Sequence, residues 1–193
     1  MVRLNEKEFH RSIVDFQLEI AKRWNQRGSE KKDDFVKFFF YFAGFNSLYY
    51  LWRVLDNLKK RDGERKHIEN LLKKFTEAKA AEILEKVDES VEYFRARPIR
   101  KMIDRSSDRP DGDLREGEEL MSQLENGSNK DRIVALGKIL YLIRSNLVHG
   151  SKRESGDDRE IVKQSIAPLD VLLEEAISLT EQEKIRLRRQ PAP

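Results

Sequence analysis

The segment from Asp33 to Lys60 constrains the fold more than any other part of the chain. Its apolar side chains recur at spacings of three and four, which predicts a helix that is apolar around most of its circumference. One face collects Phe35, Phe38, Phe39, Phe42, Tyr49 and Trp52, and another collects Phe40, Ser47, Tyr50, Leu51, Val54 and Leu58. Such a helix must be buried on two sides. One side can face the domain core, whereas the other needs a second layer of this chain or a partner chain.

The rest of the chain repeats this spacing, and strict alternation of apolar and polar residues is rare, so we predict an all-α fold. Further helices are expected near 5–27, 64–75, 76–97, 114–125, 128–149 and 161–177. Pro168 is expected to kink or break the last of them. Because 193 residues suit one domain, residues 1–193 are predicted to form a single helical domain. Residues 64–128 are predicted to be a variable insertion within it.

Composition excludes several kinds of chemistry and constrains the location of the protein. The chain has no cysteine, which removes disulfides, thiolate zinc sites and cysteine nucleophiles. Its N-terminal residues lack the apolar core of a signal peptide, and the longest apolar run, 38–52, is interrupted by Gly44, Asn46 and Ser47. We therefore expect a soluble protein of the cytoplasm. The net charge of +3 permits a polyanionic partner without requiring one.

The most basic local segment spans residues 95–109. Its cations are Arg95, Arg97, Arg100, Lys101, Arg105 and Arg109, and its acids are Asp104 and Asp108. The simpler interpretation, which we favour, is a charged helix end followed by a loop. In the alternative interpretation the segment contacts the phosphates of a nucleic acid, and Arg100 and Lys101 bind the substrate.

The motif with the most chemical content is the string from Arg144 to Lys152. No phosphate-binding glycine loop is present, and the three histidines have no neighbours at the spacing of metal ligands. Arg144 and His149 remain as candidates. By spacing alone, Arg144 reads as an ion-pair residue and His149 as the C-terminal cap of a helix, where a histidine interacts well with the helix dipole. The alternative is a catalytic pair.

The string Arg144-Ser-Asn-Leu-Val-His-Gly-Ser-Lys152 closely resembles the Arg-x4–6-His signature of the HEPN superfamily, the higher eukaryotes and prokaryotes nucleotide-binding domains. Asn146 and Lys152 fill places where that family carries a polar residue and a lysine. A second string, Tyr41-Phe-Ala-Gly-Phe-Asn-Ser-Leu-Tyr-Tyr50, is similar to the Phe-Asn-x-Leu-Tyr helix found upstream in several branches. The resemblance covers about residues 33–60 and 129–180, in the same order as in the family.

This resemblance implies an HEPN-like helical bundle that dimerises, with residues 64–128 inserted between the aromatic helix and the Arg–His helix. Many HEPN proteins are metal-independent endoribonucleases of toxin–antitoxin, abortive-infection or other defence systems. Others bind RNA, nucleotides or proteins without cleaving. We therefore expect an endoribonuclease that needs no cofactor, with RNA as substrate and an antitoxin or defence protein as partner. A non-catalytic binding module is the alternative.

The chemistry of RNA cleavage suits these residue types. The 2′-OH attacks the adjacent phosphate, and a catalyst must move protons and stabilise the charged phosphorane. A histidine suits the proton steps, and an arginine binds phosphate oxygens in a fork. The expected catalytic residues are thus Arg144, His149 and Asn146. The expected substrate-binding residues are Lys152, Asn46, Arg100 and Lys101.

The spacing of Arg144 and His149 raises a geometric difficulty. Residues five apart lie about 140° apart around a helix, and one histidine cannot easily serve as both base and acid. A two-fold dimer resolves both difficulties, because two Arg144/His149 pairs then face each other across the interface.

Overall fold

The structure is a computed structural model that describes residues 6–97, 99, 115–148 and 156–189. Within these ranges no residue lies in a β-strand, which confirms the all-α prediction. The helices are α1 (Glu6–Ser29), α2 (Asp34–Leu55), the short 3-10 helix η1 (Lys60–Asp62), α3 (Glu64–Leu72), α4 (Glu77–Lys86), α5 (Asp88–Ala96), α6 (Arg115–Asn126), α7 (Asn129–Val148) and α8 (Gly156–Arg189).

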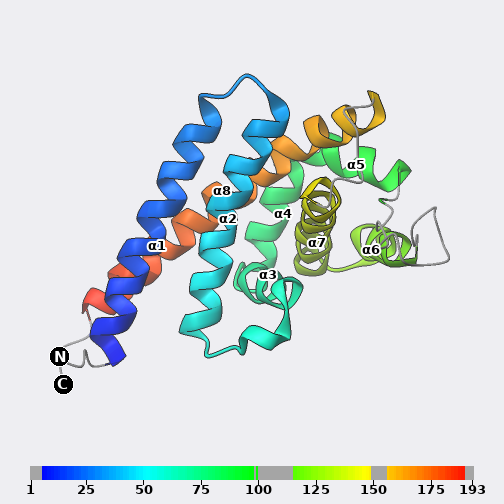
Figure 1. The fold of residues 1–193 in the computed structure, drawn as a ribbon. Helices are drawn as coiled ribbons and strands as arrows, with labels where there is room; N and C mark the ends of the chain where they lie inside the picture. Colours follow the sequence, from blue (N-terminus) through cyan, green and yellow to red (C-terminus); the bar gives the residue numbers. More distant parts are fainter. Residues whose placement is uncertain (1–5, 98, 100–114, 149–155, 190–193) are drawn as a thin grey trace.

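Helix α1 supplies the second layer that the apolar α2 needs. The two helices are antiparallel neighbours, and the long α8 packs across both (Figure 1). Close approach depends on Gly44, because a Cβ atom there would lie 3.2 Å from the carbonyl oxygen of Ala21 and 3.0 Å from Leu173 on α8. The hydroxyl of Ser47 also donates to the Gln17 carbonyl over 3.0 Å. Two sides of α2 are therefore buried by α1 and α8 of the same chain.

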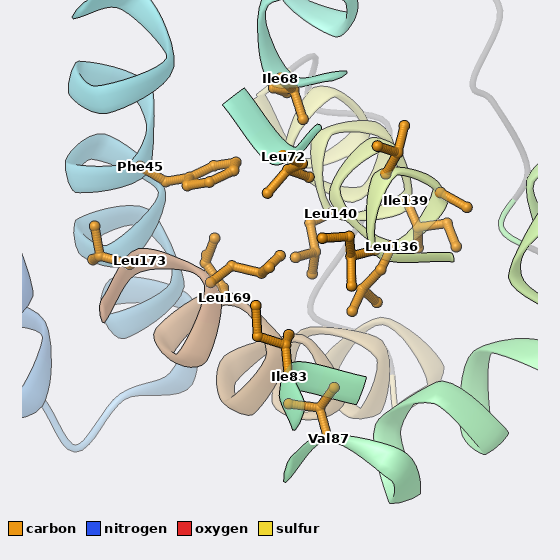
Figure 2. Packing of buried hydrophobic residues seen from close by; sticks show 14 of the residues in the cluster. Phe45, Ile68, Leu72, Ile83, Val87, Leu136, Ile139, Leu140, Leu169 and Leu173 are labelled. Carbon is orange, nitrogen blue, oxygen red and sulfur yellow. The ribbon is translucent and has the colours of Figure 1, made fainter. Parts of the chain in front are cut away.

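Helix α7 runs through the centre of the remaining core. Figure 2 shows Leu136, Ile139 and Leu140 of α7 among side chains from α2, α3, α4 and α8. Gly137 lets α3 approach closely, because a Cβ atom there would lie 2.4 Å from Leu72 Cδ1. Side chains from α3, α4, α5 and α6 thus belong to the same apolar cluster as those of α2, α7 and α8.

The predicted bounds of several helices differ from the structure, most of all for the last helix, which spans Gly156–Arg189 and not 161–177. Helix α2 ends at Leu55 and not near Lys60, since Asn57 adopts a left-handed conformation with φ of 55°, which asparagine tolerates better than most residues. The helix predicted over 76–97 is divided at Val87, whose ψ of 19° departs from helical geometry. Helix α8 continues through Pro168 without a break. A proline removes one hydrogen bond, and the packing of α8 on α1 and α2 offsets that loss.

A half-buried carboxylate, that of Glu69, ties α3 to α7. Glu69 accepts hydrogen bonds from Lys73 over 2.7 Å, from Lys138 of α7 over 3.1 Å and from Lys66 over 3.2 Å. Burial raises the pKa of Glu69, but these three ammonium groups outweigh that effect and hold the pKa at about 2, against an ordinary value of 4.5. The ionised carboxylate is therefore a stabilising link between the two helices.

We expect Glu69→Gln to lower the free energy of unfolding by about 2 kcal/mol at neutral pH. Because the folded-state pKa is lowered, this contribution is complete above pH 4.5 and is lost as the pH falls toward about 2. Urea titrations of the wild type and of Glu69→Gln at several pH values measure the two free energies of unfolding. The difference between them should shrink as the pH falls from 4.5 toward about 2. Glu82→Gln is the matched control: Lys79 and Lys86 also lower the pKa of Glu82 to about 2, but it is solvent-exposed and its replacement should cost clearly less. A gap that is constant with pH would contradict the assignment.

Candidate functional site

Arg144 lies on α7, one turn before the last residue of the helix, Val148. Its side chain is half-buried, and its guanidinium carbon lies 5.8 Å from the centroid of the Phe42 ring on α2. The cation is therefore held against an aromatic face. Within the part of the chain that the structure describes, no carboxylate forms an ion pair with Arg144. As far as the described residues go, its hydrogen-bond donors can therefore bind an anion.

Two tyrosines and one glutamate hold α2, α3 and α7 together beside Arg144. The hydroxyl of Tyr49 on α2 donates to Glu64 Oε1 over 2.9 Å, and the hydroxyl of Tyr141 on α7 also hydrogen-bonds to Glu64. Glu64 is the first residue of α3, where the helix dipole favours a negative charge. Tyr141 precedes Arg144 by three residues, so both side chains lie on one side of α7. This cluster fixes the positions of the three helices around the Arg144 side chain.

The electrostatics of the cluster keep both phenols protonated. Burial raises the pKa of Tyr49 and of Tyr141, and the charge of Glu64 raises both further. The charge of Arg144 acts in the opposite direction on both groups, which shows that its guanidinium lies close to the two rings. Neither tyrosine can serve as a base near neutral pH, and each acts as a hydrogen-bond donor.

A second cation joins the edge of this cluster. Arg65 of α3 forms an ion pair with Glu116 of α6, and its guanidinium carbon lies 5.6 Å from the centroid of the Tyr141 ring. Arg65 is thus neutralised by an acid of the chain, whereas Arg144 is not neutralised in the described residues. The contrast singles out Arg144 as the group that can bind an external anion.

The structure brings together some of the residues predicted from sequence. Asn46 is exposed on α2, one turn beyond Phe42, so it lies beside the ring against which Arg144 packs. Asn146 is only 2% exposed and takes part in interactions within the protein, so it is placed to support its neighbours and not to touch a ligand at the surface. His149, Lys152, Arg100 and Lys101 lie outside the described residues.

Sequence reasoning missed the Tyr49–Glu64–Tyr141 cluster. Tyr141 stands three residues before Arg144, a spacing that could have drawn attention to it. Tyr49 lies within the aromatic string 41–50, where it was assigned to an apolar face. Glu64 gives no signal, because it is one of 35 acids in the chain and its partners are distant in sequence.

A polar groove of about 510 Å³ between α3, α6 and α7 shares no lining residue with this site. Its lining residues are Glu69, Lys73, Ser122, Gln123, Asn126, Gly127, Asp131, Val134 and Lys138. Both of its lysines are already bound to Glu69. The groove therefore offers no uncommitted cation comparable to Arg144.

Comparison of the chain with protein-family models, with curated proteins and with solved structures finds no match in any of the three. No helix of the described ranges combines the length and apolarity needed to cross a membrane. The same ranges contain no group of three or more His, Cys, Asp or Glu side chains arranged to hold a metal ion.

Proposed function

We propose that this protein is a metal-independent endoribonuclease of HEPN type, which acts in the cytoplasm in a toxin, abortive-infection or other defence role. The observation that carries the proposal is the environment of the Arg144 guanidinium. Its guanidinium is held on the Phe42 ring without an ion pair to a carboxylate of the described chain, so it can bind an RNA phosphate. The sequence resemblance of residues 144–152 to the Arg–His signature adds independent support.

In the proposed reaction His149 removes the proton of the 2′-OH, and the resulting oxygen attacks the adjacent phosphorus. The bond from phosphorus to the 5′-oxygen breaks, and this oxygen takes up a proton. The products are a 2′,3′-cyclic phosphate and a 5′-hydroxyl. Arg144 stabilises the negative charge of the phosphorane, and the exposed Asn46 binds substrate beside it. Lys152, Arg100 and Lys101 are proposed as further phosphate contacts.

The proposed enzyme is a homodimer in which the Arg144/His149 pairs of two chains face each other. One histidine then serves as base and the other as acid. Light scattering at the protein concentration of the cleavage assay measures the oligomeric state. A monomer that cuts RNA at the full rate would exclude the dimeric site without excluding the reaction.

RNA cleavage in EDTA tests the proposed function directly. The wild-type protein should convert labelled single-stranded RNA to products with 2′,3′-cyclic phosphate ends, and His149→Ala should lose at least about 100-fold in rate. His10→Ala, which replaces a histidine of α1, is the matched control and should cut at the wild-type rate. RNA with 2′-O-methyl groups should resist cleavage. Intact RNA after incubation with wild-type protein, or equal cleavage by His149→Ala, would refute the reaction.

One observation favours a second candidate, a non-catalytic HEPN-type module that binds RNA, a nucleotide or a protein. The tyrosines nearest to Arg144 have raised pKa values, so among the described residues of the cluster neither phenol can accept a proton near neutral pH. Salt-dependent RNA binding without cleavage, weakened by Arg144→Ala but unchanged in His149→Ala, would favour this candidate.

A further inference from the structure

The layer formed by α1 and α2 has an uncovered apolar face on the side away from the core. We call it the outer face and define it by Phe9 and Phe16 of α1 and by Val36, Phe39 and Tyr50 of α2. Between 40% and 60% of each of these residues is exposed to solvent. On both helices they recur at helical spacing opposite the buried positions. The rings of Trp24 and Phe40, 5.1 Å apart, connect the two helices along this face.

The outer face is large enough to be an interaction site. At about 200 Å² for each aromatic side chain, the exposed fractions of Phe9, Phe16, Phe39 and Tyr50 amount to roughly 400 Å². Patches of about 300–600 Å² are the largest that typical monomers expose, and they are often functional.

The spacing on α1 points to a helix as the occupant. Phe9, Ile13, Phe16 and Ile20 follow one another at intervals of four, three and four residues. This is the a/d spacing of a coiled-coil seam, in which the side chains of one helix insert between those of another. Ile13 and Ile20 are half-buried, whereas Phe9 and Phe16 project into solvent. The alternation leaves gaps between the two rings into which side chains of a second helix can insert.

The charges beside the outer face indicate that the partner helix is acidic. Three cations lie over aromatic rings of this layer: Arg27 over Trp24 at 5.6 Å, Lys31 over Phe40 at 5.4 Å and Arg53 over Tyr50 at 4.5 Å. None of the three forms an ion pair with a carboxylate of the described residues. The Nε atom of Arg53 is buried and has no hydrogen-bond partner there. Two of the neighbouring acids have partners of their own, since Glu19 binds Arg23 and Asp33 caps α2.

The opposite side of the layer behaves differently. There Lys22 binds Glu181 over 2.5 Å, and Lys184 binds Asp15 over 2.7 Å, so cations between α1 and α8 have acids of the chain as partners. The cations between α1 and α8 are thus paired with acids of the chain, whereas Arg27, Lys31 and Arg53 lie over aromatic rings. These three cations can bind the carboxylates of a partner. Arginine beside an exposed aromatic ring is also a common composition of binding hot spots.

The two arginines lie toward opposite ends of the outer face. Since Ala21 lies opposite Gly44 in the antiparallel pair, Arg27 is level with about residue 38 of α2. Arg53 is then about 22 Å farther along the layer, at 1.5 Å for each residue. A helix lying along the outer face would span this distance with about 15 residues, and acids near its two ends would reach both guanidinium groups.

We propose that the outer face of α1 and α2 is a docking surface for an acidic amphipathic helix of a partner protein. The apolar side of that helix packs on Phe16 and Phe39, and its carboxylates bind Arg27 and Arg53. A second copy of this chain fits less well, because it brings the same unpaired cations to the interface. RNA bases can also stack on the exposed rings, but the a/d spacing of the α1 side chains matches a helix, and the test below separates the two occupants. The proposal does not depend on RNA cleavage.

A labelled synthetic helix of about 20 residues, with Leu at the a and d positions and Glu on both flanks, tests the proposal with the full-length protein. Fluorescence anisotropy should show binding at least about tenfold tighter than that of the same peptide with Lys in place of Glu. Phe16→Ser, Phe39→Ser and Arg53→Glu should each weaken binding of the Glu peptide by about tenfold or more. Ile185→Ser and Arg186→Glu on α8 are the matched controls, and they should leave binding unchanged.

Circular dichroism and thermal melting verify that each variant is folded. Three outcomes would overturn the proposal: the Glu peptide does not bind, the Lys peptide binds equally well, or the control variants weaken binding as much as the outer-face variants. Light scattering that shows a dimer dissolved by Phe16→Ser would assign the face to a second copy. Binding of single-stranded RNA that is lost in Phe16→Ser would assign it to nucleic acid. Either of these results would also overturn the proposal.

Discussion

Replacing Arg144 with alanine is expected to reduce the rate of RNA cleavage by at least about 1,000-fold while leaving the fold intact. The guanidinium is the cation of the described site without an ion pair to a carboxylate of the described residues, and both neighbouring phenols direct their hydroxyl protons to Glu64, so the guanidinium is the group placed to stabilise the phosphorane. The variant also loses the contact with the Phe42 ring, at a cost of about 1 kcal/mol in the free energy of unfolding. That cost is small enough for a folded protein.

Two further variants separate charge from geometry. Arg144→Lys keeps the positive charge but cannot bind two phosphate oxygens in a fork, so we expect cleavage about 10- to 100-fold slower than wild type. Lys74→Ala is the control, because it removes another cation from an aromatic ring, that of Trp52, at 4.4 Å, and should keep the wild-type rate. Single-turnover cleavage of labelled RNA in EDTA measures all three. Wild-type activity in a folded Arg144→Ala protein would refute the assigned role.

Phe45→Ala is expected to lower the free energy of unfolding by about 4 kcal/mol. Phe45 is fully buried on α2 and lies at the junction of α2 with the core around α7 (Figure 2). Its ring also contacts those of Phe42 and Tyr49, so the same substitution disturbs the surface that supports Arg144. A loss of this size is a large part of the stability of a domain.

The same substitution at an exposed position of the same layer provides the control. Phe16 on α1 is 60% exposed, and Phe16→Ala should change the free energy of unfolding by less than about 0.5 kcal/mol. Urea denaturation of both variants and the wild type measures the difference. Equal losses for Phe16 and Phe45 would show that the outer face is covered in solution, and an equally small effect of both would contradict the packing of α2.

Much of the helical architecture was predictable because periodicity is a local property. The spacing of apolar residues located α2 and α7. At the starts of two expected helices, 76–97 and 128–149, the hydroxyl oxygens of Thr76 and Ser128 accept from the Lys79 and Asp131 amides. The ends of α2 and α4 were less predictable. They depend on single backbone angles at Asn57 and Val87, which the apolar pattern does not encode.

The candidate site was predictable only in part. The string that contains Arg144 could be recognised, as could the aromatic string that contains Asn46, because both are continuous in sequence. The surroundings of Arg144 could not. Its ring partner Phe42 is 102 residues away, and Glu64 reaches the cluster from α3, so their proximity depends on how three helices pack.

The sequence by itself determined that the chain is all-α, that α2 is buried on two sides and that an arginine lies near the end of α7. The tertiary structure decided which elements cover α2: α1 and α8 of the same chain cover two sides, and the outer face is left exposed. It also decided that Arg144 packs on the Phe42 ring, where no carboxylate of the described residues forms an ion pair with it. The physical reason is that the periodicity of a helix specifies which side chains share a face, whereas the partner of that face is chosen by contacts between distant segments.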